Sequence, residues 1–281
     1  MRKGPPSDAR RAAQHLILVS MTLGLPAVAS AQQASPSNAR TTAPIDLTGY
    51  WVSIVNEDWR WRMMTPAKGD FESVPYTDEA RKVADAWDLA QDEATGNACK
   101  PFGVGNIMRM PGRLHITWQD DRTLRLDFDA GTQTRLLHFD GLAPAGAERT
   151  WQGHSVASWD RPVVPPRDRT AGNNANRLRE QGLIGGTAAP GGSLKVVTTR
   201  MRAGHLRKNG LPYSENAVVS EYFDRITYPN GDTWLIVRTV VDDPKYLQVP
   251  FMTSSNFKLE RDGAKWHPTP CKIDPPSRQG R

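Results

Sequence analysis

The stretch from Asp46 to Met64, DLTGYWVSIVNEDWRWRMM, constrains the fold of this 281-residue chain most strongly. Near its start it contains Gly49-Tyr50-Trp51. A glycine that bends the backbone, followed closely by a large aromatic side chain, can begin a closed antiparallel barrel, because the ring then fills one end. We therefore predict a first strand over 46–55. The segment Trp59–Met63 alternates aromatic or aliphatic with basic residues, and this period of two predicts a second, half-buried strand.

The first 31 residues predict a secretory signal. A basic lead precedes a short apolar run over 16–25, and Ala29-Ser30-Ala31 supplies the small residues of a cleavage site. The apolar run is too short for a membrane span, and none is predicted elsewhere. We therefore expect a periplasmic or secreted protein cleaved after about Ala31. Arg10-Arg11 leaves both the general secretory and the twin-arginine export routes open.

The charge pattern argues against a nucleic-acid partner. The formal net charge of +6 falls once the basic signal is removed, and the remaining basic residues are scattered. Nucleic-acid binding requires a clustered basic face, which the sequence does not show. The interleaved rings and arginines of Trp59–Met63 also occur where side chains stack on bases or sugars, and this alternative stays open.

Cys99 and Cys271 are the only cysteines. In an oxidising compartment two thiols most often pair, whereas a redox pair favours close spacing and a metal site favours neighbouring histidines. We predict a disulfide that fastens the C-terminal tail to the segment before the main sheet. The histidines after the signal lie outside ligand spacing of one another, so no metal and no cofactor are expected.

The rest of the chain predicts a barrel with one helix. Thr77 caps a helix that runs to about Asp92, with acids in its first turn. The other predicted strands are 113–119, 123–129, 132–139, 150–159, 193–201, 217–227, 233–241 and 249–258. Their succession by short turns favours a single antiparallel up-and-down barrel of about 8–10 strands over 46–271.

The segments outside the barrel strands lack a strand or helix pattern. Residues 32–45 predict a flexible leader and residues 272–281 a loose tail. Residues 160–192 are rich in proline and glycine, and a connection of this length predicts a lid or a disordered loop.

Hairpin geometry fixes one candidate pair, His115 and Asp127. A three-residue loop over 120–122 keeps the apolar side chains of both strands on one face, and it sets His115 opposite Asp127. A carboxylate beside a histidine is an arrangement used in general acid–base catalysis. The alternative is that this polar face is the solvated outside of the barrel.

A second candidate pair is Glu221 with Arg238. Asn230-Gly231 predicts a two-residue turn, which sets Phe223 opposite Arg238 and places both charges on one face with Phe223 and Trp234. Charges among aromatic rings are paired or functional. The pair could be a structural salt bridge or the polar anchor of a pocket.

The loop over 200–213 is the third candidate. It carries Arg202, His205 and Tyr213 together with Arg207 and Lys208. Loops at the mouth of a barrel commonly contact ligand, and a basic mouth would suit an anionic one. A solvated turn explains the same residues equally well.

Gly49-Tyr50-Trp51 resembles the Gly-x-Trp motif at the first barrel strand of the lipocalin and calycin families. The resemblance implies a lipocalin-like barrel. The chain departs from it in length and in placing the helix near Thr77 before most of the barrel. The chain also resembles a set of uncharacterised exported bacterial proteins, which offers no activity to transfer. The stretches that carry this second resemblance are DLTGYWVS, PGRLHITW, DAGTQTR, RTWQG, LRKNGLPYSENAVVSEYFDR and NGDTWL.

Three functions follow as hypotheses. The first is binding of a small, largely apolar or anionic ligand in the barrel cavity. The second is cofactor-free isomerase, lyase or hydratase chemistry in the same cavity, and the third is a structural envelope role with a filled barrel. The sequence does not indicate an oligomeric state.

Overall fold

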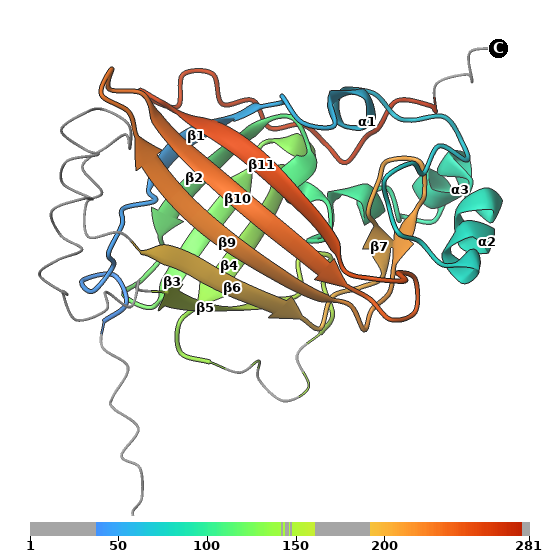
Figure 1. Cartoon of the computed structure of the whole chain (residues 1–281), viewed down its shortest axis with the longest axis horizontal. Coiled ribbons are helices and arrows are strands. Elements are labelled where there is room, and N and C mark those ends of the chain that lie inside the picture. Colours follow the sequence, from blue (N-terminus) through green and yellow to red (C-terminus); the bar gives the residue numbers. More distant parts are fainter. Residues whose placement is uncertain (1–37, 142, 144–145, 147, 161–191, 277–281) are drawn as a thin grey trace, which may run out of the picture. The chain divides into compact units, whose positions relative to one another are not determined.

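The computed structural model describes residues 38–141, 143, 146, 148–160 and 192–276. Nine strands form one closed barrel and follow one another around it in chain order (Figure 1). They are β1 (Gly49–Ile54), β2 (Arg113–Trp118), β3 (Thr123–Phe128), β4 (Gln133–His138), β5 (His154–Asp160), β6 (Ser193–Thr199), β9 (Val218–Thr227), β10 (Thr233–Asp242) and β11 (Phe251–Glu260). The predicted all-β barrel is confirmed. The predictions for 1–31, for residues 32–37 of the leader, for 161–191 and for the last five residues lie outside the described residues.

One pair of neighbouring strands, β4 and β5, runs parallel, and every other neighbouring pair is antiparallel. Strand directions that alternate around a closed ring of nine must repeat once. The last residues of β4 pair with the first residues of β5, and parallel neighbours of this kind cannot be joined by a two-residue hairpin.

Apolar side chains at alternate positions along the strands fill the inside of the barrel. Trp51 is fully buried there, and its indole nitrogen donates to the carbonyl of Leu47 over 2.9 Å. Other fully buried inward side chains are Leu114, Ile116, Leu126, Leu137, Leu194, Val196, Phe223, Leu235 and Val237. This apolar core holds the sheet closed, because a one-residue slip of any strand would expose its apolar set.

A cap, defined here as residues 55–112 and 200–217, covers the barrel end at which β1 and β6 finish and β2 and β9 begin (Figure 1). It contains α1 (Trp59–Met63), α2 (Asp78–Ala86), α3 (Leu89–Ala94), η1 (Lys100–Phe102), η2 (Ile107–Arg109), β7 (Gly204–His205) and β8 (Pro212–Tyr213). A second apolar cluster joins cap residues such as Phe71, Leu206 and Tyr213 to Val219 and Val241 of the barrel. A short turn, η3 (Ala130–Thr132), connects β3 to β4.

The predicted strand over Trp59–Met63 is wrong, because this segment is the helix α1. Asp58 adopts a left-handed conformation with φ of 51°, and its carbonyl accepts hydrogen bonds from the amides of Trp61 and Arg62. Trp59 and Met63 then share the solvent face one turn apart, while Arg62 is buried. Five residues are too few for the period of two to distinguish a strand from one helical turn.

The predicted helix over Thr77–Asp92 is divided into α2 and α3. The Thr77 hydroxyl caps α2 as expected, accepting from the Ala80 amide over 3.2 Å. Trp87 leaves the helical conformation, with ψ of 137°, and Asp88 caps a new helix by accepting from the Ala90 amide. The break brings the Trp87 indole to Asp92, to which it donates over 2.8 Å.

The two predicted hairpin registers have opposite outcomes. Between β2 and β3, Ile116 lies opposite Leu126 and His115 opposite Asp127, as predicted. Between β9 and β10 the predicted register is wrong by one residue, since Phe223 lies opposite Val237 and not Arg238.

Pro229 explains the second outcome. The amide of Gly231 donates to the carbonyl of Tyr228, and the amide of Tyr228 donates to the carbonyl of Asp232, so the loop has three residues. Proline favours the second position of a type I turn, and Gly231 then forms a bulge with φ of 86°.

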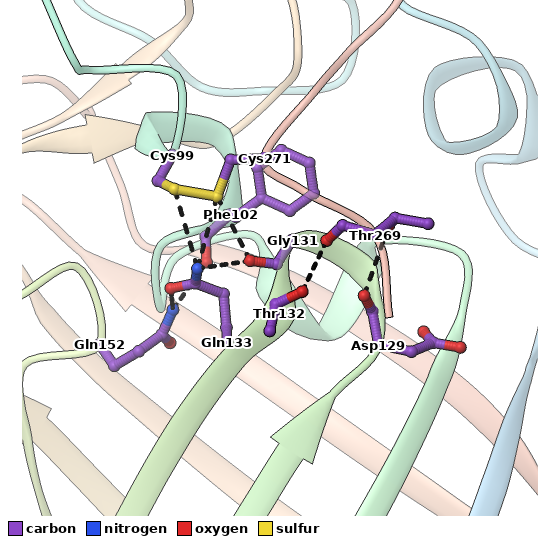
Figure 2. Close-up of a disulfide and its surroundings, with 9 residues drawn as sticks. All are labelled: Cys99, Phe102, Asp129, Gly131, Thr132, Gln133, Gln152, Thr269 and Cys271. Carbon is purple, nitrogen blue, oxygen red and sulfur yellow. Dashed lines mark hydrogen bonds between the residues drawn. A yellow bond between two sulfur atoms is a disulfide. The ribbon is translucent and has the colours of Figure 1, made fainter. Parts of the chain in front are cut away.

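The predicted disulfide between Cys99 and Cys271 is confirmed (Figure 2). Beneath it, the Gln133 side-chain amide donates to the Gly131 carbonyl, and Gln152 donates to both Gln133 and the Phe102 carbonyl. The tail is held further by the Thr269 amide, which donates to the Asp129 carbonyl. The chain that follows β11 is thus fastened to the cap. Among the described residues, no helix is both long and apolar enough to cross a membrane.

We expect the double substitution Cys99→Ala and Cys271→Ala to lower the free energy of unfolding by up to about 5 kcal/mol. The chain-entropy account gives this upper value for a loop of 172 residues. Urea unfolding of oxidised wild-type protein and of the double variant measures the difference. Equal midpoints, or two free thiols in exported protein, would contradict the structure.

Trp51→Ala should lower the free energy of unfolding by about 3–5 kcal/mol, because it removes the largest fully buried side chain of the core. Trp59→Ala is the matched control, since Trp59 is 62% exposed and its loss should cost less than about 0.5 kcal/mol. Denaturant unfolding of both variants tests this, and similar losses in the two would show that Trp51 is not a core residue.

Candidate functional site

The predicted pair His115 and Asp127 lies on the outside of the barrel. The His115 ring stacks on Tyr50 with ring centroids 3.8 Å apart, and partial burial lowers the pKa of His115. Burial raises the pKa of Asp127, but hydrogen bonds from Arg125 and Thr134 outweigh this and lower it. The carboxylate of Asp127 is therefore committed to Arg125 and Thr134, which favours the solvated-face interpretation.

The predicted pairing of Glu221 with Arg238 is wrong, because the corrected register places them on opposite faces of the sheet. Phe223 shares the inside with Glu221, and Trp234 shares the outside with Arg238. Arg238 is exposed and lies 3.2 Å from a carboxylate oxygen of Asp224.

Glu221 instead pairs with Arg135 of β4 inside the barrel. The two side chains are fully buried and joined by two hydrogen bonds of 2.6 and 3.2 Å. The hydroxyls of Ser155 and Thr198 accept from the same guanidinium. A sequence signal existed, since Arg135 falls in phase with the inward Leu137 within the predicted strand 132–139.

Arg135→Met should lower the free energy of unfolding by about 3–5 kcal/mol, since it leaves the carboxylate of Glu221 buried without its counterion. The double variant Arg135→Met with Glu221→Leu should recover most of this loss. Arg238→Met is the matched control and should change stability by less than about 1 kcal/mol, because its ion pair is exposed. Chemical denaturation measures all three, and an Arg135→Met variant as stable as the control would contradict the buried pair.

The loop over 200–213 is part of the cap core. Arg202 is exposed and stacks over the Trp151 ring at 4.0 Å, but His205 and Tyr213 are buried. Tyr213 fits only because glycine occupies three neighbouring positions, where a Cβ would overlap its ring or hydroxyl. These are Gly103, Gly105 and Gly204.

His205 faces Asp92, with 3.9 Å between its Nε2 atom and a carboxylate oxygen. Burial lowers the pKa of His205 to about 4 and outweighs the opposing effect of Asp92. The imidazole is therefore neutral at neutral pH. The carboxylate of Asp92 is occupied by Trp87 and by Lys100, whose ammonium lies 2.6 Å away.

The cap also holds three buried arginines, which we call the arginine cluster: Arg62 of α1, Arg109 of η2 and Arg207 between β7 and β8. Their exposed fractions are 2%, 4% and 2%. Arg62 Nε donates to the Arg109 carbonyl over 3.0 Å, and Arg207 stacks over the Trp61 ring at 4.6 Å. Next to them, Lys208 donates to the Arg62 carbonyl over 2.8 Å. Three separate chain segments thus bring four basic groups into one buried region.

The arginine cluster is incompletely paired. Arg109 reaches Asp58 over 2.8 Å, but within the described residues neither Arg62 nor Arg207 has a carboxylate oxygen within 4.0 Å. Four buried nitrogen atoms of the arginine cluster have no hydrogen-bond partner among the described residues: Arg62 Nη1, Arg109 Nη1, and Nε and Nη1 of Arg207. An unpaired buried donor costs about 1–3 kcal/mol, and more when it carries charge. Buried polar groups are normally hydrogen-bonded, so four such donors in one region of the described chain are unusual.

The electrostatics of the arginine cluster favour an anion. Burial, followed by the positive charge of Arg109, lowers the pKa of Arg62 to about 10 and that of Arg207 to about 10, and these effects outweigh the opposing charge of Asp58 on both. Burial also lowers the pKa of Lys208 to about 8. Arg109 thus repels both of the other guanidinium groups. An added negative charge would relieve this repulsion.

Sequence reasoning found Arg207 and Lys208 but missed Arg62 and Arg109. Arg62 was assigned to a strand with its charge outward, and Arg109 lies in an irregular segment. No local pattern reveals that the two are buried, because that depends on how the cap folds against the barrel.

Within the described ranges, no group of three histidine, cysteine or acidic side chains is arranged to hold a metal ion. Comparisons of the chain with protein-family models, with curated proteins and with solved structures gave no match.

Proposed function

We propose that this chain binds a small anionic molecule, through a carboxylate or phosphate group, at the arginine cluster. The observation that carries the proposal is the burial of Arg62 and Arg207 without ion pairs. Buried charges in proteins are normally paired, and arginine presents planar donors suited to both kinds of oxyanion. The predicted signal over 1–31, together with a disulfide, supports action outside the cytoplasm.

The arginine cluster is better supported as the binding region than the centre of the barrel. Inward side chains such as Ile116, Val196 and Leu235 are fully buried, so a ligand there would have to displace them. The nitrogen atoms of the arginine cluster are also closed off from solvent, and an anion reaches them after a local movement. We expect α1 to move, because it is only five residues long and carries Arg62 and Trp61.

A structural envelope role is the second candidate, and the filled barrel favours it. The catalytic hypothesis relied on buried polar pairs in one cavity, with His115, Asp127, Glu221 and Arg238 as the candidates. The first two and Arg238 lie outside the barrel and Glu221 lies inside, so these four side chains do not meet.

Sulfate, phosphate and citrate should raise the melting temperature of the wild-type protein above that in chloride at equal ionic strength. A ligand at one hundred times its Kd stabilises the folded state by about 2.7 kcal/mol. Arg207→Met should lose the difference between these anions and chloride, while its stability in chloride stays equal or rises, because it removes two unpaired buried donors.

Arg60→Met is the matched control. Arg60 belongs to α1, the helix that carries Arg62, but it is exposed and paired with Asp70. It should keep the anion response, which separates site binding from the general stabilisation that sulfate and phosphate give to folded proteins. A full anion response in Arg207→Met would rule out the proposed site and leave the structural role.

A further inference from the structure

A pocket of about 660 Å³ lies on the outside of the barrel, separate from the arginine cluster. It is formed by the outer face of β10 and β11, the β9–β10 turn and the residue Asn56 that follows β1. Trp234 faces outward there because its neighbours Thr233 and Leu235 face the core. The three-residue turn between β9 and β10 sets the register that places Trp234 on this outer face.

Two aromatic rings line the pocket. Tyr228 is 49% exposed, and Trp234 is half-buried against the sheet. Both offer flat apolar faces at low conformational cost, and each has a polar group at its edge. Pro229, the second residue of the turn, holds Tyr228 in place beside the outer face of β10.

Apart from Pro229 and Ile236, the rest of the lining consists of planar amide and carboxylate groups. The Asn256 side chain donates to the Asn56 side-chain oxygen over 2.9 Å, which fixes how both amides are oriented. An amide has two donors and an acceptor, so this bond leaves Asn56 with donors and Asn256 with an acceptor for another molecule. Asn230 and Asp232 form a similar pair in the turn, with 3.2 Å between them.

The charge of the pocket is nearly balanced. Asp232 is its one charged lining side chain in the described part of the molecule, and the Lys258 ammonium lies 2.9 Å from it. This site therefore differs from the arginine cluster, because no unpaired cation is present to attract an anion. A purely apolar ligand would leave the remaining donors and acceptors of these four polar side chains without partners.

We propose that this pocket binds a saccharide. A sugar ring has an apolar face of C–H groups that packs on Trp234 or Tyr228, and its edge carries hydroxyls in adjacent pairs. Each hydroxyl both donates and accepts, which matches the Asn56–Asn256 and Asn230–Asp232 pairs. Small-molecule sites combine apolar walls and few oriented polar groups in this way. This inference is independent of the proposed anion site.

The test measures binding of cellotriose, maltotriose and chitotriose to the full exported chain by saturation-transfer NMR and calorimetry. At least one trisaccharide should bind with a Kd below about 10 mM. Trp234→Ala should weaken that binding at least tenfold, or about 1.4 kcal/mol. Asn56→Ala, at an exposed position, should also weaken it without a change in melting temperature.

Trp59→Ala is the matched control, because Trp59 is exposed and does not line the pocket. It should bind the same trisaccharide as tightly as the wild type. The proposal is overturned if none of the three binds at about 10 mM, or if Trp234→Ala and Asn56→Ala bind normally. It is equally overturned if Trp59→Ala loses as much affinity as Trp234→Ala.

Discussion

The pairing of β1 with both β2 and β11 is the constraint on which the rest of the structure depends. It joins the beginning of the domain to its end, and it leaves the nine-stranded sheet without a free edge. Trp51 sits at this closure with Leu114 on one side and Leu259 on the other. The same closure brings the chain that follows β11 back to the cap, where Cys271 meets Cys99 (Figure 2).

Charged groups are treated differently in the barrel and in the cap. Inside the barrel, Arg135 and Glu221 neutralise each other through two hydrogen bonds, and two hydroxyls accept from the same guanidinium. In the cap, Arg62 and Arg207 are buried to a similar degree, and among the described residues no carboxylate lies within ion-pair distance of either, although Asp58 acts on both from further away. A balanced pair is compatible with a structural role, whereas unbalanced charge persists only if the surrounding fold tolerates its cost. This contrast is the reason to propose an anion site in the cap and not inside the barrel.

Backbone turns control which side chains reach the surface. The three-residue turn at Pro229–Gly231 sends Arg238 and Trp234 outward and keeps Phe223 and Glu221 inside. A two-residue turn would exchange the faces of one strand relative to the other. The ion pair Arg135–Glu221 and the outer pocket around Trp234 both follow from this one local choice.

The sequence by itself determined the closed barrel, the first hairpin register and the disulfide, because alternation and turn length are local properties and only two cysteines were present. Tertiary structure decided the parallel pair β4–β5, the helical state of Trp59–Met63 and the partner of Glu221. It alone brought Arg62, Arg109 and Arg207 together, since these residues lie on segments distant in the sequence. Burial of a charge depends on what packs over it, and no pattern within one segment records that.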